Sequence, residues 1–163
     1  MNLKVDDLFE QLVRETERAI KRRACSDPVM VGIHTGGVWL AEKLHAALKI
    51  ESPLNHLNIN YHRDDLGHGG IHTQSKPSLM CTDINDRHVV LVDDVLQTGR
   101  TVRAALNEVF DHGRPQSILL AVLLARKQRE LPICADAIGL ELDLQPEQKI
   151  KLKGPDPLRL EVD

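Results

Sequence analysis

Hydrophobic residues fill three short stretches of the chain almost without interruption. These stretches are Val29 to Ile33, Val89 to Val92 and Ser117 to Ala125. Continuous apolar runs of this length are typical of parallel strands that are covered on both faces. The sequence therefore predicts three buried strands at the centre of the protein.

Between these strands, hydrophobic residues recur at intervals of three and four, the period of a helix with one buried face. The pattern predicts helices from Val38 to Leu48 and from about Gly99 to His112, with Gly113 and Pro115 as stop signals. Strands that alternate with helices predict an α/β fold with a doubly wound, right-handed parallel sheet flanked by helices.

The two ends of the chain follow other patterns. Asn2 to Ala24 has helical spacing, and Leu54 to Tyr61 alternates loosely, as an edge strand does. The tail predicts short strands at Ala137 to Leu140, Lys149 to Lys153 and Leu158 to Val162. We interpret 1–163 as one domain, with a core at about 26–125 and a small β-rich hood from about 1–25 and 126–163.

Composition narrows the class of protein. The 163 residues carry a net charge of −3 and include only one Trp, one Tyr and two Phe, so a base-stacking nucleic-acid platform is not expected. The three cysteines lie far apart, and no apolar run is long enough to cross a bilayer. The sequence therefore predicts a reduced, cytoplasmic protein with no membrane partner.

The candidate chemistry begins where the central apolar run ends. Asp93 and Asp94 follow Val92 directly, and a short loop with Thr98 and Gly99 leads into the next helix. The carboxyl ends of parallel strands line the ligand crevice of open α/β sheets. Two carboxylates can accept both hydroxyls of a ribose, and a loop at a helix N-terminus suits a phosphate. The stretch therefore predicts a site for a ribose 5-phosphate.

The complete stretch resembles the phosphoribosyl-pyrophosphate (PRPP) motif of the type I phosphoribosyltransferases. The residues that carry the resemblance are Val89, Val90, Leu91, Val92, Asp93, Asp94, Val95, Leu96, Gln97, Thr98, Gly99, Arg100 and Thr101. From about Val29 to Gly139 the chain is similar to the PyrR family of pyrimidine attenuation regulators and uracil phosphoribosyltransferases. The resemblance implies that this stretch binds PRPP, and that Asp93 and Asp94 are the catalytic pair that stabilises a positively charged ribose.

The resemblance also implies a pyrophosphate subsite at Thr35, Gly36, Gly37 and Arg63. Relatives usually carry an arginine where this chain has Gly36, so one charged contact is missing. The polar, glycine-rich stretch at about 63–78 would be a flexible lid over the reaction centre. Mg²⁺ would enter with PRPP and be held mostly by oxygen atoms of the substrate, with no protein site of its own.

The base subsite implied by the resemblance consists of Arg126, Ile138 and Gly139. The surrounding segment, Ala125 to Ile133, keeps only part of the pattern of the relatives. A recognition site that loses a polar partner loses much of its discrimination. The departures therefore favour low activity.

The expected function is a pyrimidine-responsive transcription regulator that also converts uracil and PRPP into UMP and pyrophosphate. One alternative is an inactive regulator that senses UMP or PRPP and binds the leader RNA of pyrimidine genes. Its candidate RNA contacts are Arg14, Arg18, Arg22, Lys127 and Arg129. A purine salvage enzyme is a second alternative, which Gln97 disfavours because its amide cannot act as a general base. Relatives form dimers or larger homo-oligomers, and the same is expected here.

Overall fold

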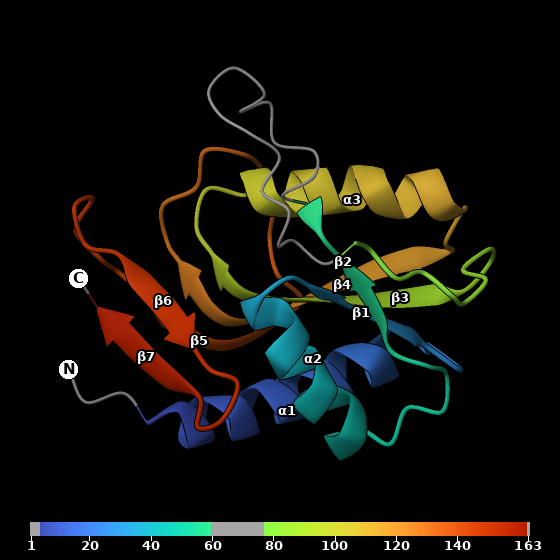
Figure 1. Cartoon of the computed structure of the whole chain (residues 1–163), viewed down its shortest axis with the longest axis horizontal. Helices are drawn as coiled ribbons and strands as arrows, with labels where there is room; N and C mark the ends of the chain where they lie inside the picture. Colours follow the sequence, from blue (N-terminus) through green and yellow to red (C-terminus); the bar gives the residue numbers. More distant parts are fainter. Residues whose placement is uncertain (1–3, 60–76, 163) are drawn as a thin grey trace.

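The computed structural model describes residues 4–59 and 77–162 of the chain. A five-stranded parallel sheet with the order β2-β1-β3-β4-β5 lies between helices on its two faces (Figure 1). The strands are β1 (Val29–Ile33), β2 (Asn55–Leu57), β3 (His88–Leu96), β4 (Ser117–Arg126) and β5 (Ala137–Leu142). The helices are α1 (Val5–Arg22), α2 (Gly36–Ala47) and α3 (Arg100–His112). The predicted α/β fold with a parallel sheet is confirmed.

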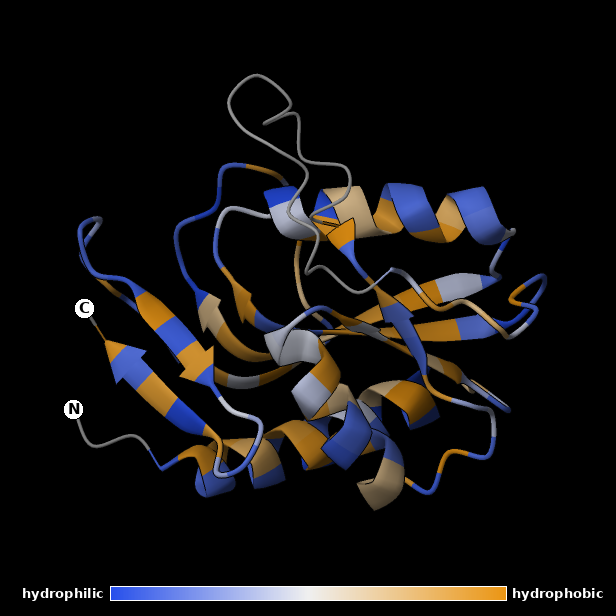
Figure 2. Cartoon of the chain, viewed as in Figure 1, coloured by the Kyte–Doolittle hydropathy of each residue, from blue (hydrophilic) through white to orange (hydrophobic). Residues whose placement is uncertain are grey.

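The side chains of the central strand alternate between two hydrophobic cores. Val90 and Val92 face the core that α1 and α2 cover, and Val89 and Leu91 face the core beneath α3. All four are fully buried. Because successive residues of a strand point to opposite faces, only a strand covered on both sides is apolar at every position. Figure 2 shows hydrophobic residues along the central strands of the sheet.

The strand predicted at 137–140 belongs to the main sheet, and its assignment to the hood is wrong. β5 pairs in parallel with β4, with Ala121 opposite Ala137 and Leu124 opposite Leu140. α1 packs on the same two strands, so the N-terminal helix covers the core sheet. A short alternating pattern is the same for the edge of a large sheet and for a separate small one, and the sequence does not distinguish them.

The end of the chain forms a separate antiparallel hairpin of β6 (Ile150–Lys153) and β7 (Arg159–Val162). The hairpin buries Ile150 and Leu152 against the core that α1 and α2 cover. Its turn lies against the first half of α2: a Cβ placed on Gly154 would come within 2.9 Å of the Trp39 ring. The hairpin is therefore held to the body of the protein on its inner face.

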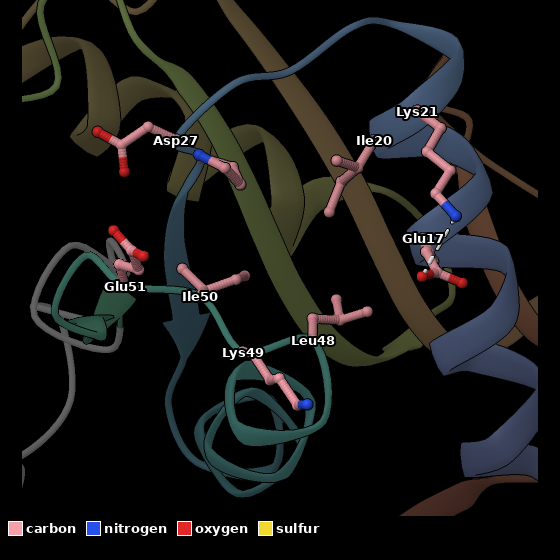
Figure 3. Close-up of a pocket in the computed structure, with 9 residues that line it drawn as sticks. Glu17, Ile20, Lys21, Asp27, Leu48, Lys49, Ile50 and Glu51 are labelled. Atoms are coloured by element: carbon pink, nitrogen blue, oxygen red, sulfur yellow. Dashed lines mark ion pairs between the residues drawn. The ribbon is translucent and has the colours of Figure 1, made fainter.

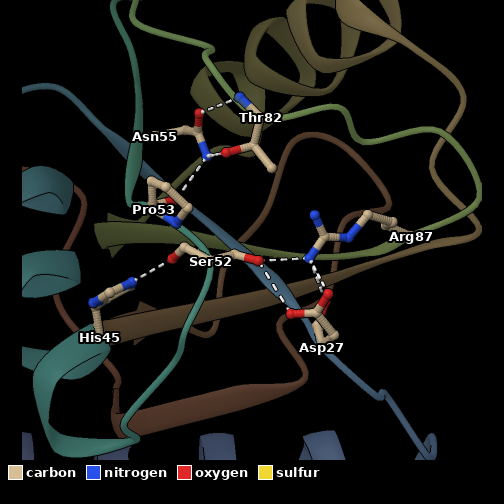
Figure 4. Close-up of polar contacts among 7 residues, drawn as sticks. All are labelled: Asp27, His45, Ser52, Pro53, Asn55, Thr82 and Arg87. Atoms are coloured by element: carbon tan, nitrogen blue, oxygen red, sulfur yellow. Dashed lines mark hydrogen bonds and ion pairs between the residues drawn. The ribbon is translucent and has the colours of Figure 1, made fainter.

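Polar side chains fasten the loops at the amino-terminal edge of the sheet (Figure 4). Arg87 pairs with Asp27 at 2.7 Å and donates to the Ser52 hydroxyl at 2.6 Å. The fully buried Asn55 donates to the Thr82 hydroxyl at 3.1 Å.

None of the described helices is long and apolar enough to cross a membrane.

Candidate active site

The two motif carboxylates lie near the carboxyl end of the central strand. β3 sits between β1 and β4, so Asp93 and Asp94 are at the middle of the sheet edge. Asp93 is only 5% exposed, and Asp94 is half-buried. The Asp93 Oδ1 atom accepts the Asp94 N–H at 2.9 Å, and the Asp94 Oδ1 atom accepts the Val95 N–H at 2.9 Å. These bonds hold both side chains against their own backbone.

Burial raises the pKa of the Asp93 carboxyl well above its ordinary value, and the neighbouring Asp94 charge raises it further. An ionised carboxylate loses hydration when it is buried, and a like charge nearby adds repulsion. Perturbed carboxyl groups of this kind are concentrated at functional sites. A cation or a positively charged sugar at this place would relieve the repulsion and favour the ionised form of Asp93.

The glycine turn lies directly beside this pair. α2 begins at Gly36, after Thr35, so its first backbone N–H groups are at the turn. A Cβ added to Gly36 would collide with the Asp94 carboxylate, and one added to Gly37 would meet the Val92 carbonyl oxygen at 2.5 Å. The structure thus brings Thr35, Gly36 and Gly37 together with the acid pair, and glycine is required for the contact.

The loop after the acid pair turns into α3 through a left-handed residue. Gly99 has φ +93°, a conformation that residues with a side chain rarely adopt. The Thr98 hydroxyl accepts the Arg100 N–H at 3.2 Å, and the Gly99 carbonyl accepts the Arg103 N–H at 2.9 Å. The loop therefore places the start of α3 at the same edge of the sheet as the acid pair, and the N-terminus of a helix is a favourable place for an anion.

The segment that contains Glu130 and Leu131 contacts the loop at Thr98 and Gly99. From the sequence, this segment is predicted to lie near the base. The backbone N–H groups of Glu130 and Leu131 both donate to the Thr98 carbonyl, at 3.1 and 3.0 Å. A Cβ on Gly99 would come within 3.2 Å of the Leu131 Cβ. These contacts join positions more than 30 residues apart. No local sequence signal could have found them.

The side chain of Arg100 forms an ion pair with Glu130. Its Nε donates to a Glu130 carboxylate oxygen at 2.8 Å, and the two side chains are 65% and 57% exposed. Exposed pairs of this kind contribute about 0–1 kcal/mol. Arg100 therefore has an acid partner near the loop, and Thr98 and Thr101 remain half-buried at the loop itself.

The three residues predicted to bind the base do not converge. Arg126 is 5% exposed and donates to the carbonyl oxygens of Leu144, Gln145 and Gln148 at 3.3, 3.0 and 3.3 Å. Its guanidinium is thus used to hold the loop after β5. This contact depends on where that loop folds back, which the sequence does not show.

Ile138 and Gly139 lie on opposite faces of the sheet. Ile138 packs on the core beneath α3, whereas a Cβ on Gly139 would meet the Leu8 carbonyl oxygen of α1 at 2.8 Å. Gly139 therefore allows close packing of α1 on the sheet. A contact between Ile138 and the base stays a prediction, as does the role of Arg63, which lies outside the described residues with most of the lid at 63–78.

A cavity of about 470 Å³ lies at the opposite edge of the sheet (Figure 3). Its floor is apolar, and charged side chains of both signs surround it. The lining residues are Glu17, Ile20, Lys21, Asp27, Pro28, Leu48, Lys49, Ile50 and Glu51. Pro28 directly precedes β1, so this cavity is at the amino-terminal edge and is separate from the acid pair.

The donor set near the glycine turn suits a hard cation. Asp93 and Asp94 supply carboxylate oxygens, which are the ligands that Mg²⁺ prefers. Among the described residues, no group of three or more His, Cys, Asp or Glu side chains forms a metal cluster. The residues present thus fit a magnesium ion that takes only part of its coordination from the protein.

The fold and this arrangement of acids, glycine turn and helix-start loop define a protein of the phosphoribosyltransferase class. The model of the phosphoribosyl transferase domain family matches residues 2–151. The chain is 50% identical to the Bifunctional protein PyrR of Nitrosococcus oceani over 164 residues, covering 99% of this chain and 93% of that protein. It is 47% identical to that of Pseudomonas syringae pv. tomato, covering 96% and 92% of the two chains. The chain belongs to the PyrR family of phosphoribosyl transferase domain proteins.

Solved structures support the fold. A hypoxanthine phosphoribosyltransferase from Staphylococcus aureus aligns with a TM-score of 0.66 at 17% identity, covering 91% of this chain and 79% of that chain. A purine phosphoribosyltransferase from Pyrococcus horikoshii aligns with a TM-score of 0.61 at 22% identity, covering 86% and 85%. At these identities the likeness concerns the fold alone.

Proposed function

We propose that this protein is a pyrimidine-responsive regulator of the PyrR type that also transfers the ribose 5-phosphate of PRPP to uracil. The products are UMP and pyrophosphate. The observation that carries the enzymatic part is the Asp93–Asp94 pair at the centre of the sheet edge, with the Gly36 turn on one side and the Thr98 loop after it. Membership in the PyrR family supports the regulatory part.

In this proposal each element of the site has a separate task. The N–H groups at the start of α3 and the hydroxyls of Thr98 and Thr101 bind the 5-phosphate. Asp93 and Asp94 accept the ribose hydroxyls, and their charge stabilises the positive sugar that forms as the bond from C1 to pyrophosphate breaks. The bond from C1 to the ring nitrogen of uracil forms in its place, and the proton of that nitrogen leaves with the pyrophosphate. The turn at Gly36 receives the departing pyrophosphate.

Magnesium fits this site as a companion of PRPP. When bound, it neutralises part of the pyrophosphate charge, which the acid pair alone would repel. Asp94 is the more exposed member of the pair and is the residue we assign to the cation. Asp93 stays against the backbone and orients the ribose.

The test is release of pyrophosphate from PRPP in the presence of uracil and Mg²⁺, with hypoxanthine and orotate as control bases. Asp94→Asn should lower the rate by about 100-fold, in the range of losses seen when one electrostatic contact to a transition state is removed. Asp111→Asn is the matched control, because Asp111 is an exposed carboxylate on α3. Absence of turnover with every base at high protein concentration would exclude the enzymatic part.

An inactive sensor is the second candidate, and two observations favour it. The pyrophosphate turn has no side chain at Gly36, and the Arg126 guanidinium is bound to backbone carbonyls of a loop. A sensor of this kind would bind UMP, measured by calorimetry, without catalysing its formation. A purine salvage enzyme is the weaker alternative, because the exposed Gln97 side chain is a neutral amide.

We further propose that the regulatory part acts through RNA, as a cytoplasmic homo-oligomer. Three of the candidate RNA-contacting cations lie beside acidic side chains. The Arg14 guanidinium lies 3.8 Å from the Glu10 carboxylate, and the Arg18 guanidinium lies 2.8 Å from the Glu15 carboxylate. Lys127 lies 3.8 Å from Asp143. Light scattering tests the oligomeric state, and binding of RNA at low salt tests the regulatory part.

A further inference from the structure

The cavity at the amino-terminal edge of the sheet is built from three separate parts of the chain. The end of α1, the residues before β1 and the chain that follows α2 meet there (Figure 3). Its volume of about 470 Å³ lies within the range of small-molecule sites, about 300–1,000 Å³. Because the strands are parallel and the acid pair follows the carboxyl half of β3, the phosphoribosyl site lies at the other edge and does not include this cavity.

The floor of the cavity consists of apolar side chains that are only half-buried. Ile20, Leu48 and Ile50 pack on the core that α1 and α2 cover, but none of them is fully enclosed. Pro28 is half-buried as well. A ligand with an apolar body would remove this surface from water, which favours binding.

Two charged side chains that line the cavity have no ion partner. Among the residues that the structure describes, Lys49 and Glu51 form no ion pair. Asp27, the other carboxylate near Glu51, differs in this respect, because it lies 2.7 Å from the Arg87 guanidinium. The cavity therefore offers one uncompensated positive charge and one uncompensated negative charge to a ligand.

The charges are distributed over two ends of the cavity. In Figure 3 the carboxylates of Asp27 and Glu51 lie on one side of the apolar side chains, and the ammonium groups of Lys21 and Lys49 lie on the other. The Lys21 ammonium is 3.4 Å from the Glu17 carboxylate, and both side chains are exposed. Exposed pairs of this kind contribute little to stability, so Lys21 can exchange its partner for the anion of a ligand.

Lys49 occupies a position at which glycine is the usual residue. The Lys49 N–H donates to the Ala46 carbonyl at 3.2 Å, and the Ile50 N–H donates to the His45 carbonyl at 3.2 Å. These two bonds end α2 in a left-handed turn, with a φ of 53° at Lys49. A residue with a side chain is strained there, and glycine would relieve the strain. A lysine that lowers stability in this way is expected where its side chain binds something.

We propose that this cavity binds a small linear zwitterion with an apolar body, of the size of a dipeptide. Its ammonium group pairs with Glu51 and Asp27, its apolar side chains cover the floor, and its carboxylate pairs with Lys49 and Lys21. Opposite charges at the two ends of one molecule match the two uncompensated charges of the cavity, which a simple anion or a simple cation does not. This binding is independent of the proposed phosphoribosyl transfer.

The test uses the full-length protein and the dipeptide Leu-Leu as the probe, with binding measured by isothermal titration calorimetry. We expect a Kd of about 0.1–1 mM, as for a small ligand with two charged contacts. N-acetyl-Leu-Leu lacks the ammonium group and Leu-Leu-amide lacks the carboxylate. Each should bind about tenfold more weakly than Leu-Leu, because each loses one charged contact.

Two variants test the two ends of the cavity. Lys49→Gly should weaken binding about tenfold and raise the Tm by about 2 °C, because it removes both the ammonium group and the left-handed strain. Glu51→Gln should weaken binding by a similar factor without changing the Tm. Lys43→Gln and Glu42→Gln are the matched controls, because both side chains are exposed on α2 and neither lines the cavity. Both controls should bind Leu-Leu as the wild type does.

Several results would overturn the proposal. If the wild type shows no binding of Leu-Leu up to about 10 mM, the cavity is not a site for this class of ligand. N-acetyl-Leu-Leu that binds as tightly as Leu-Leu would replace the zwitterion by a ligand with a carboxylate alone. Displacement of Leu-Leu by UMP, or an equal loss of binding in the control variants, would place the dipeptide elsewhere on the protein.

Discussion

Replacing Asp93 by asparagine should make the protein more stable at neutral pH while it impairs the site. Asp93 is 5% exposed, its negative charge faces that of Asp94, and both effects raise its pKa. Asparagine has the same shape, and its Oδ1 atom can still accept the Asp94 N–H that Asp93 accepts at 2.9 Å. The substitution therefore removes a buried charge with little change in packing.

The pH dependence of the gain follows from the raised pKa of the Asp93 carboxyl. Below the ordinary carboxyl pKa, Asp93 is protonated in the folded and unfolded chains, and the variant gains nothing. As pH rises through the folded-state pKa, the wild type loses the stability that the protonated carboxyl provides. Each tenfold difference in proton affinity corresponds to about 1.4 kcal/mol. We expect a gain of about 1–3 kcal/mol near pH 8, within the usual range of single substitutions.

Urea denaturation between about pH 5 and pH 8 measures this gain in the free energy of unfolding. In a thermal scan, the Tm should rise by about 2–4 °C for each kcal/mol gained. Asp94→Asn is the companion variant, because removal of its charge should lower the pKa of Asp93. In the double variant the two effects should not add. A variant that is less stable than the wild type at pH 8, or a difference that does not change with pH, would refute the reasoning.

Three further substitutions test other contacts of the site. Gly36→Ala should raise the KM for PRPP by about tenfold, since the new Cβ would displace the Asp94 carboxylate. An unchanged KM would show that the turn accommodates a methyl group beside Asp94. Gly99→Ala should cost about 1–2 kcal/mol in urea denaturation, because φ is +93° and the Leu131 Cβ is 3.2 Å away; equal stability would contradict this. Arg126→Gln should lower stability by about 1–3 kcal/mol, because it removes charged hydrogen bonds to loop carbonyls. A rise in the KM for uracil at unchanged stability would instead support the predicted role of Arg126 in binding the base.

Residue patterns predicted the sheet well because its strands are buried on both faces. Apolar runs such as Val89 to Val92 are required only where helices cover both sides, so the pattern and the layer architecture are the same constraint. The residue pattern did not predict that β5 belongs to this sheet. It is the edge of the sheet, with a mixed burial pattern that equally suits a small separate sheet. Which strand it pairs with depends on contacts between distant parts of the chain, and a local residue pattern does not show them.

The same distinction applies to the site. By itself, the sequence determined that a buried strand ends in Asp93 and Asp94 and is followed by a glycine loop and a helix, because these are local features of one continuous stretch. Only the tertiary structure decided that the Gly36 turn lies against Asp94 and that Leu131 supports the loop at Gly99. It also decided that Arg126 is engaged by a distant loop. Such contacts depend on which strands become neighbours and on where side chains lie once the core has formed, and no local pattern of residues records either.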